Sequence, residues 1–373
     1  MYQKSVFIFR RDLRLKDNTG LINALYSSDS IYCFFISDSN IFKSSKLSYS
    51  SFSLPIDANL LLKRRQRRQH LLRFLKESLL DLQTQFYQFP LEKYQVNRSK
   101  DSGKITSKLI LVVGDPASVT KKIIQTDKEI EAVFVNRDYT PYSIKRDQSI
   151  EEICKNHNID FIDCPDILIN EPDELLNSKN QPFKVFFQYY NKAIERPLRK
   201  ESSFDITRYN NNILKFDDKK LIDFDNIEGI DNLDRFFSQI IGEQTLNKNT
   251  RFLPRLIGTR KRYQELISEL KYKYNKNNRY NEKNLLDNTT SYLSPYLKFG
   301  ICSIREVYSA IQKEFGYNHP SIRQLYWRDF FVYIGFHFPF VFNTPFQESR
   351  GLNRLIQDDL VTLNKNYIKC KID

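Results

Sequence analysis

The stretch VFIFRRDLRLKDNTGL, from Val6 to Leu21, decides the fold of this 373-residue chain. It opens with apolar residues of β-branched and aromatic type, which predict a buried strand, and then turns abruptly charged. Four similar apolar runs follow, at residues 31–36, 109–113, 132–136 and 160–163. Helix-like stretches such as residues 71–83 separate these runs. Strands that alternate with helices predict a doubly wound α/β domain, in which helices cover both faces of a parallel sheet.

The strand pattern fades after about residue 170, and two different compositions follow it. Residues 171–250 are rich in Asn, Asp and Lys and predict an irregular connector with short helices. From residue 251 onward helical periodicity dominates. We therefore predict an α/β domain over residues 2–169, a connector over residues 170–250 and an all-helical domain over residues 251–373. The helical domain is expected to be almost wholly helical as far as residue 350.

The chain is basic, with 58 Lys and Arg residues against 45 Asp and Glu residues and a formal net charge of +13. Such a charge suits a polyanionic partner, because Lys and Arg near phosphates release condensed counterions. A solvated basic face that reflects biased composition explains the charge equally well. The charge alone therefore leaves nucleic-acid binding and a plain solvated surface open.

Cysteine usage and hydropathy indicate an intracellular, soluble protein. Five cysteines are scattered along the chain and never spaced as CxxC, which predicts reduced thiols and no zinc site. No run of about 18 apolar residues is present, so we expect no membrane span. The N-terminus lacks the long apolar run and the cleavage site of a secretory signal.

Several classes of enzyme are excluded because their motifs are missing. The sequence has no P-loop, no G-x-G-x-x-G and no H-E-x-x-H, and it has four histidines in all. No cluster of carboxylates predicts nuclease-type metal chemistry. If the protein is an enzyme, a cofactor must carry the difficult chemistry.

A second informative stretch is TTSYLSPYLKFG, from Thr289 to Gly300. Ser294 followed by Pro295 predicts a helix start, because Ser caps free amides and Pro suits the first turn. Gly300 fits the left-handed position just past the helix end. Hydroxyls and free amides at a helix N-terminus can hold a phosphate, although capped helices are common in every class of protein.

A third stretch, QLYWRDFFVYIGFHFP, runs from Gln324 to Pro339. Four of its apolar residues are spaced at i, i+3, i+4 and i+7, namely Trp327, Phe330, Phe331 and Ile334. This spacing predicts one face of a buried helix, and we assign Phe330 and Phe331 to the core.

These three stretches resemble motifs of the photolyase/cryptochrome flavoprotein family. The first resembles F-R-x-D-L-R-x-x-D-N, the second T-S-x-L-S-P-Y-L-K-F-G and the third W-R-[DE]-F. The segments Gly114–Pro116, Asn136–Asp147 and Asn180–Tyr190 agree with the resemblance, whereas Ile8 stands where many relatives have Trp. The resemblance covers nearly the whole chain. It implies a class I-like deoxyribodipyrimidine photolyase, with an antenna-type α/β domain followed by a helical FAD-binding domain.

The resemblance also implies roles for individual residues. The residues expected to contact FAD are Thr290, Ser291, Leu293, Ser294, Arg328 and Tyr280. Those expected to contact the lesion or DNA are Gln324, Trp327 and Arg279, with Tyr274 competing for the place of a Tyr upstream of the second motif. A rigid π-face such as that of Trp327 suits stacking on a flipped base, and an always-charged guanidinium suits a flavin. In the first motif, Asp12, Arg14 and Asp17 are interpreted as a structural ion-pair and loop-capping network.

The mechanism implied by the resemblance is light-dependent. A basic surface captures damaged DNA, and the pyrimidine dimer flips out into the helical domain, helped by its weakened stacking. Excited reduced FAD transfers an electron to the cyclobutane dimer, the ring splits and the electron returns. An antenna chromophore of unidentified kind is expected against the α/β domain. Thr140 argues against folate, because folate-binding relatives carry Glu at this place.

The sequence also departs from the family pattern. The family's later Trp-x-x-Gly-x-Thr-Gly and Asp-Ala-x-Met-Arg stretches are not found, so the FAD-binding domain is expected to be incomplete. Trp327 is the only Trp, which leaves no tryptophan chain in this polypeptide. We expect one part of a split enzyme completed by a C-terminal polypeptide, and otherwise a monomer. A cryptochrome-like flavoprotein without repair activity, or an inactive remnant, is the alternative. Gln324 is more usual in (6-4) photolyases and animal cryptochromes, so the (6-4) photoproduct is the alternative lesion.

Overall fold

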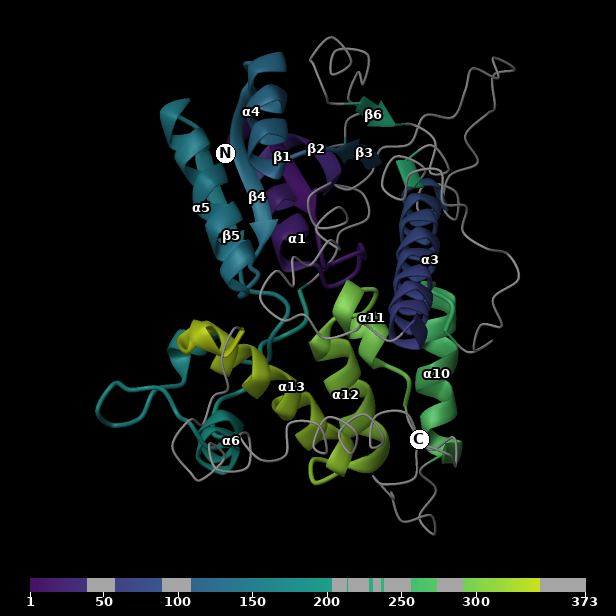
Figure 1. The fold of residues 1–373 in the computed structure, drawn as a ribbon. Coiled ribbons are helices and arrows are strands. Elements are labelled where there is room, and N and C mark those ends of the chain that lie inside the picture. Colours follow the sequence, from purple (N-terminus) through teal and green to yellow (C-terminus); the bar gives the residue numbers. More distant parts are fainter. Residues whose placement is uncertain are drawn as a thin grey trace.

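The structure is a computed structural model (Figure 1). It describes residues 1–38, 58–88, 109–202, 213, 228–230, 236–237, 256–273 and 291–342. The strands lie in its upper half with helices beside them, and most of the later helices gather below (Figure 1).

The upper half is built on a six-stranded sheet with the order β5-β4-β1-β2-β3-β6. Its strands are β1 (Tyr2–Phe9), β2 (Ser28–Ser37), β3 (Leu109–Val113), β4 (Ile130–Asn136), β5 (Asp160–Cys164) and β6 (Glu228–Ile230). The first five strands pair in parallel, and β6 pairs antiparallel with β3 at the edge. The predicted doubly wound parallel sheet is therefore confirmed. The antiparallel edge strand was not predicted, because three residues are too short to show a period.

Helices cover both faces of this sheet. On one face lie α1 (Thr19–Ser27) and α3 (Ala58–Gln88), packed against Phe7 and Phe9 of β1. On the other lie α4 (Pro116–Thr126) and α5 (Pro141–Asn156), packed against Val6 and Ile8 of the same strand. Because β1 is buried on both faces, its sequence is a continuous apolar run rather than an alternating one.

Side-chain caps start three of these helices. The side chains of Asn18, Asp115 and Thr140 accept hydrogen bonds from the backbone amides of Leu21, Ser118 and Ser143. Each cap satisfies an amide that has no partner inside the helix. Thr140 therefore has a local structural role as a helix cap. This role explains why a Thr stands at the position, whether or not a chromophore binds nearby.

The lower half is helical in the part of residues 251–342 that the structure describes. Its helices are α10 (Arg260–Lys273), α11 (Ser294–Phe299), α12 (Ile304–Phe315) and α13 (Pro320–His337), followed by the 3-10 helix η3 (Pro339–Phe342). The earlier helix α6 (Phe186–Ile194) and the 3-10 helix η1 (Pro172–Glu174) lie beside α13 (Figure 1). The core of this half includes Tyr189 of α6 as well as residues of α10 to α13. Part of the predicted connector thus packs with the helices that follow it.

One core assignment was wrong. Phe330 is buried at 6% exposure, as predicted, but Phe331 is 66% exposed. The two residues are about 100° apart around the helix, so only one of them can point fully into the core. Phe340, on η3, is also exposed, at 48%.

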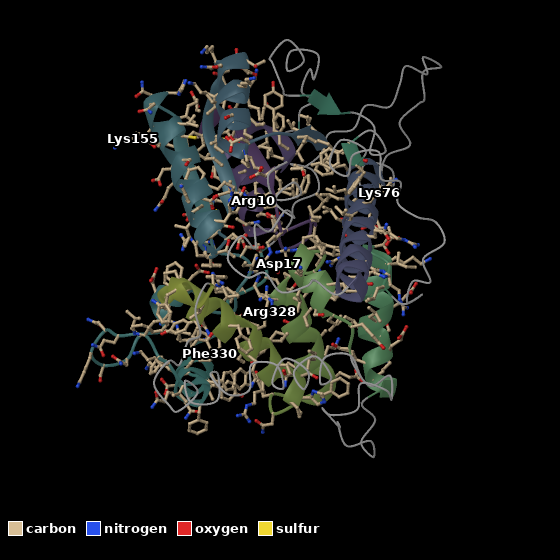
Figure 2. All side chains as sticks on the ribbon, viewed as in Figure 1. Arg10, Asp17, Lys76, Lys155, Arg328 and Phe330 are labelled. Atoms are coloured by element: carbon tan, nitrogen blue, oxygen red, sulfur yellow. The ribbon has the colours of Figure 1, made fainter. Side chains whose placement is uncertain are left out.

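A buried ion network joins the two halves. The guanidinium of Arg305, on α12, contacts the carboxylates of Asp17 and Asp166 at 2.9 and 2.8 Å. Arg14 also contacts Asp166, at 2.7 Å, and all four side chains are at most 2% exposed. Asp17 lies where the strands and the lower helices meet (Figure 2). The interpretation of Arg14 and Asp17 as structural residues is confirmed. Asp12 belongs to the adjoining loop, where it accepts hydrogen bonds from Arg10 N and Asn136 Nδ2.

Gly300 allows the same junction to close. It ends α11 with φ of +67°, the left-handed conformation predicted for it. A Cβ atom at this position would lie 2.0 Å from the carbonyl oxygen of Arg11 and 2.4 Å from the Cα of Asp12. Beside it, the backbone amide of Leu13 donates to the carbonyl of Phe299 at 3.1 Å. The charged loop after β1 and the end of α11 are thus in backbone contact.

Gly300→Ala is expected to destabilise the fold by more than left-handed strain alone. That strain costs roughly 1–2 kcal/mol, and displacing the loop after β1 should add about 1–3 kcal/mol. Urea unfolding measures the sum. Asn158→Ala is the matched control, because Asn158 has φ of 56° at an exposed turn and already carries a Cβ atom. Equal losses from the two variants would contradict the role given to Gly300.

Candidate functional site

Six of the nine predicted site residues lie in the described part of the chain. Ser291, Leu293 and Ser294 lie at the start of α11, and Gln324, Trp327 and Arg328 lie on α13. The other three, Arg279, Tyr280 and Thr290, lie outside the described residues.

The start of α11 has an unusual backbone. Tyr292 adopts φ of 56°, which is uncommon for an aromatic residue. The helix begins at Ser294, as predicted, but its cap position is Leu293, and no side chain caps it. Leu293 is itself buried in the lower core, whereas Ser294 is exposed and Ser291 half-buried. Two hydroxyl groups therefore stand at a helix start that no side chain caps.

Trp327 is held in an aromatic stack. Its ring lies parallel to the ring of Phe186, with a centroid distance of 3.6 Å and an interplanar angle of 9°. Phe330 meets the indole edge-on at 5.8 Å, and Phe331 lies at 5.7 Å with a tilt of 31°. The indole is thus covered on one face by α6 and stays half-buried.

The outer face of α13 carries cationic, polar and aromatic side chains. Arg323 and Gln324 are exposed one helical turn before Trp327, and Phe331 is exposed one turn after it. The Cζ atom of Arg323 lies 5.5 Å from the ring centroids of both Phe186 and Tyr190. An exposed guanidinium beside aromatic rings is a surface that suits both stacking and anionic groups.

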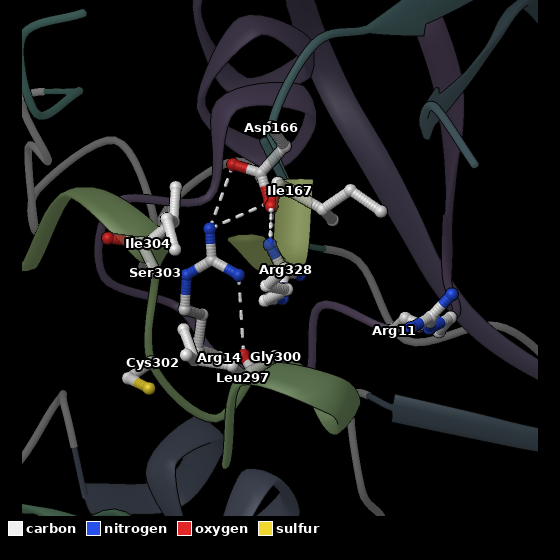
Figure 3. Close-up of a pocket in the computed structure, with 10 residues that line it drawn as sticks. All are labelled: Arg11, Arg14, Asp166, Ile167, Leu297, Gly300, Cys302, Ser303, Ile304 and Arg328. Carbon is white, nitrogen blue, oxygen red and sulfur yellow. Dashed lines mark hydrogen bonds and ion pairs between the residues drawn. The ribbon is translucent and has the colours of Figure 1, made fainter. Parts of the chain in front are cut away.

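Arg328 points into the junction, toward Ile167 (Figure 3). Its Nη1 donates to the carbonyl of Ile167 and to Oδ1 of Asp329, both at 2.8 Å. It lines a very small cavity together with Arg14, Asp166 and Gly300. Burial raises the pKa of Asp329 to about 6, against the opposing effect of Arg328. Arg328 thus lies close to the end of α11. Its side chain contacts Ile167, whereas the side chain of Trp327 packs on α6.

A larger cavity, of about 370 Å³, lies between α5, η1 and the end of α13. Its wall includes Arg137, Tyr139, Phe161, Glu171 and Phe336. The Tyr139 hydroxyl donates to Glu171 at 2.7 Å, and burial followed by this carboxylate raises the Tyr139 pKa far above its usual value. Arg137 contacts both Asp163 and Glu171. No motif in the sequence predicts this cavity, because its wall comes from four separate segments.

Two kinds of feature are absent from the described residues. No group of three or more His, Cys, Asp or Glu side chains is placed there to hold a metal ion. None of the helices in this part of the chain has the length and apolar character needed to cross a membrane.

Comparison with known proteins gives consistent relatives. The DNA photolyase family matches residues 5–91 and 99–204. The deoxyribodipyrimidine photo-lyase of Synechococcus sp. is 26% identical over 192 residues, which are 52% of this chain and 32% of that protein. The deoxyribodipyrimidine photo-lyase of Alkalihalophilus pseudofirmus is 26% identical over 237 residues, 62% of this chain and 45% of that protein. The chain thus spans less than half the length of these two relatives.

Solved structures agree with the sequence relatives. The photolyase of Sulfolobus tokodaii, described with two FAD molecules, has a TM-score of 0.62 and 25% identity. The match covers 91% of this chain and 61% of that one. A cryptochrome of Synechocystis sp. has a TM-score of 0.64 at 18% identity, covering 95% of this chain and 68% of its own, and supports the fold alone.

Proposed function

The chain belongs to the DNA photolyase family, and from this premise we propose that it takes part in light-dependent repair of cyclobutane pyrimidine dimers in DNA. The observation that carries the proposal is the outer face of α13. There Trp327, held flat against α6, lies between exposed Arg323 and exposed Phe331. A fixed aromatic face beside a guanidinium is the kind of surface that single bases stack on.

In this proposal, residues of α11 and α13 would line one side of a bound FAD. The hydroxyls of Ser291 and Ser294 lie at a helix start without a side-chain cap, where a phosphate can accept hydrogen bonds. Phe331, at 66% exposure, offers apolar area for a ring to cover. When bound and reduced, FAD would supply the electron that splits the dimer. The protein's own contribution is to hold flavin and lesion close together and to keep water away.

The remaining partners follow from the same proposal. The net charge of +13 supports capture of DNA through its phosphates. Arg279 and Tyr280 stay proposed contacts to DNA and flavin. An antenna chromophore stays proposed against the α/β domain. The cavity of about 370 Å³ between α5, η1 and the end of α13 is within the size range of small-molecule sites. A C-terminal polypeptide that supplies further helices also stays proposed.

A second candidate function is a light-responsive flavoprotein without repair activity. Gln324 favours it, because this exposed position on α13 carries an amide where many dimer-repairing relatives have a carboxylate. The same residue favours the (6-4) photoproduct as the alternative lesion. Binding measurements on undamaged, dimer-containing and (6-4)-containing duplexes separate these candidates.

Trp327→Ala is expected to weaken binding to dimer-containing DNA more than binding to undamaged DNA. Loss of one base–aromatic stack is worth about 1–3 kcal/mol, and only an extruded base can make it. Fluorescence anisotropy with labelled duplexes, one undamaged, one with a cyclobutane dimer and one with a (6-4) photoproduct, measures the three affinities. Phe340→Ala is the matched control, because it removes a ring that is 48% exposed on η3.

Each pattern of affinities has a defined meaning. A loss confined to the (6-4) duplex would replace the proposed lesion with the alternative one. Equal losses on all three duplexes would contradict the stacking role of Trp327. A wild-type chain that binds damaged and undamaged DNA equally would favour the non-repair candidate.

A further inference from the structure

Phe186 has no assigned role, although its ring makes the closest parallel ring contact described in the structure. It is 5% exposed and is the first residue of α6, directly after Val185 at the cap position. Its ring lies 3.6 Å from that of Trp327 with an angle of 9° between the planes. We propose that Phe186 is a positioning residue for Trp327, fixing the plane in which the indole meets a flipped base. This inference rests on the proposed function.

The geometry distinguishes Phe186 from the other rings around Trp327. Phe330 contacts the indole at 80° and Phe331 at 31°, both more than 5 Å away between centroids. The ring of Phe186 is the nearest of the three to the indole and the only one of them parallel to it. Phe186 therefore sets the orientation of the indole and covers one of its two faces. A base can stack only on the opposite face.

Phe186 is itself held by rigid elements. The amide of Phe183, just before α6, donates to the hydroxyl of Tyr333 on α13 at 2.8 Å. That hydroxyl in turn donates to the carbonyl of Leu175 at 2.6 Å. Tyr189, one turn after Phe186, packs between Phe330 and Tyr333. Phe186 is thus fixed relative to α13, the helix that carries Trp327, as a positioning residue requires.

The cation above the stack supports the same assignment. Arg323 precedes Trp327 by one helical turn, and its Cζ lies 5.5 Å from the ring centroid of Phe186. Arg323 is exposed, whereas Phe186 is buried. Phe186 therefore links the indole to the guanidinium, and both must lie in fixed positions for a base and its phosphate to be bound together.

The first test uses the fluorescence of the full chain, in which Trp327 is the only Trp. Phe186→Leu keeps an apolar side chain of similar length but removes the parallel ring. We expect lower fluorescence anisotropy of Trp327 and faster quenching by acrylamide. Phe186→Tyr, which keeps the ring, should restore wild-type values. Phe134→Leu is the matched control, because Phe134 is 1% exposed in the sheet core and belongs to a different cluster.

The second test measures the preference for dimer-containing over undamaged duplex. Ordering a loosened side chain on binding lowers affinity by roughly two- to tenfold, so Phe186→Leu should reduce the preference by about that factor while Phe186→Tyr retains it. Unchanged Trp327 fluorescence in Phe186→Leu would overturn the proposal. So would an unchanged preference in a variant whose fluorescence has changed. If the wild type has no preference, the proposed function fails, and the fluorescence result alone decides whether Phe186 fixes Trp327.

Discussion

Arg305→Met is expected to lower the free energy of unfolding by about 3–5 kcal/mol at neutral pH, the usual result of removing one partner from a buried ion network. Arg305 contacts Asp17 and Asp166, and both carboxylates are fully buried. Without the guanidinium, Asp17 loses its contact with Arg305, and Asp166 keeps its contact with Arg14. Urea unfolding of the purified variant measures the loss. Arg196→Met is the matched control, because Arg196 contacts Glu174 at 3.6 Å on the surface. That variant should lose less than about 1 kcal/mol.

The pH dependence of this loss has a definite sign. Although burial alone raises the pKa of Asp166, Arg14 and Arg305 hold it well below its usual range. A carboxylate of this kind stabilises the fold above its unfolded-state pKa of about 3.9, and the contribution is lost as the pH falls through its folded-state pKa. The difference between wild type and Arg305→Met should therefore be largest near neutrality and narrow below about pH 4. A difference that widens on acidification would contradict the role given to Asp166.

The sheet could be predicted because strands buried on both faces have a distinctive sequence. Val6 and Phe7 of β1 pack on opposite faces of the sheet, and both faces are buried. The strand is therefore apolar at every such position, with no alternation of polar and apolar residues. The charged residues after β1 could also be interpreted, because charges that enter an interior must be paired. Their partners could not be named. Asp166 lies 152 residues from Arg14, and Arg305 lies 288 residues from Asp17.

The candidate site could be predicted only in part. Helical periodicity identifies which residues share one face of a helix, but it does not identify the residues that pack against that face. Trp327 and Arg328 are adjacent in one motif, yet one stacks on α6 and the other contacts Ile167 at the junction. Phe331 was assigned to the core because the spacing fits, but nothing in the described structure covers it sufficiently to bury it. Phe186 lies in an aromatic run whose residues look equivalent in sequence. Only packing selects it for the parallel contact.

The 373-residue polypeptide alone is expected to purify with little flavin. In the proposed site, Phe331 is left 66% exposed, and the match covers 61% of the Sulfolobus tokodaii photolyase. Covering one aromatic group buries roughly 150–250 Å², worth about 4–6 kcal/mol, or roughly three to four orders of magnitude in dissociation constant. A flavin that is left open on one side forgoes a gain of this size. The ratio of flavin to protein absorbance measures the occupancy.

Co-expression with a fragment that supplies the remaining family helices should raise that ratio toward one flavin per chain. The gain should depend on the outer face of α13, so Phe331→Asp, which places a charge on it, should abolish the gain. Tyr317→Asp is the matched control, because Tyr317 is equally exposed, at 69%, just after α12. Stoichiometric FAD on the polypeptide without the fragment would show that the residues present already enclose the flavin. A gain that survives Phe331→Asp but not Tyr317→Asp would move the flavin site away from α13.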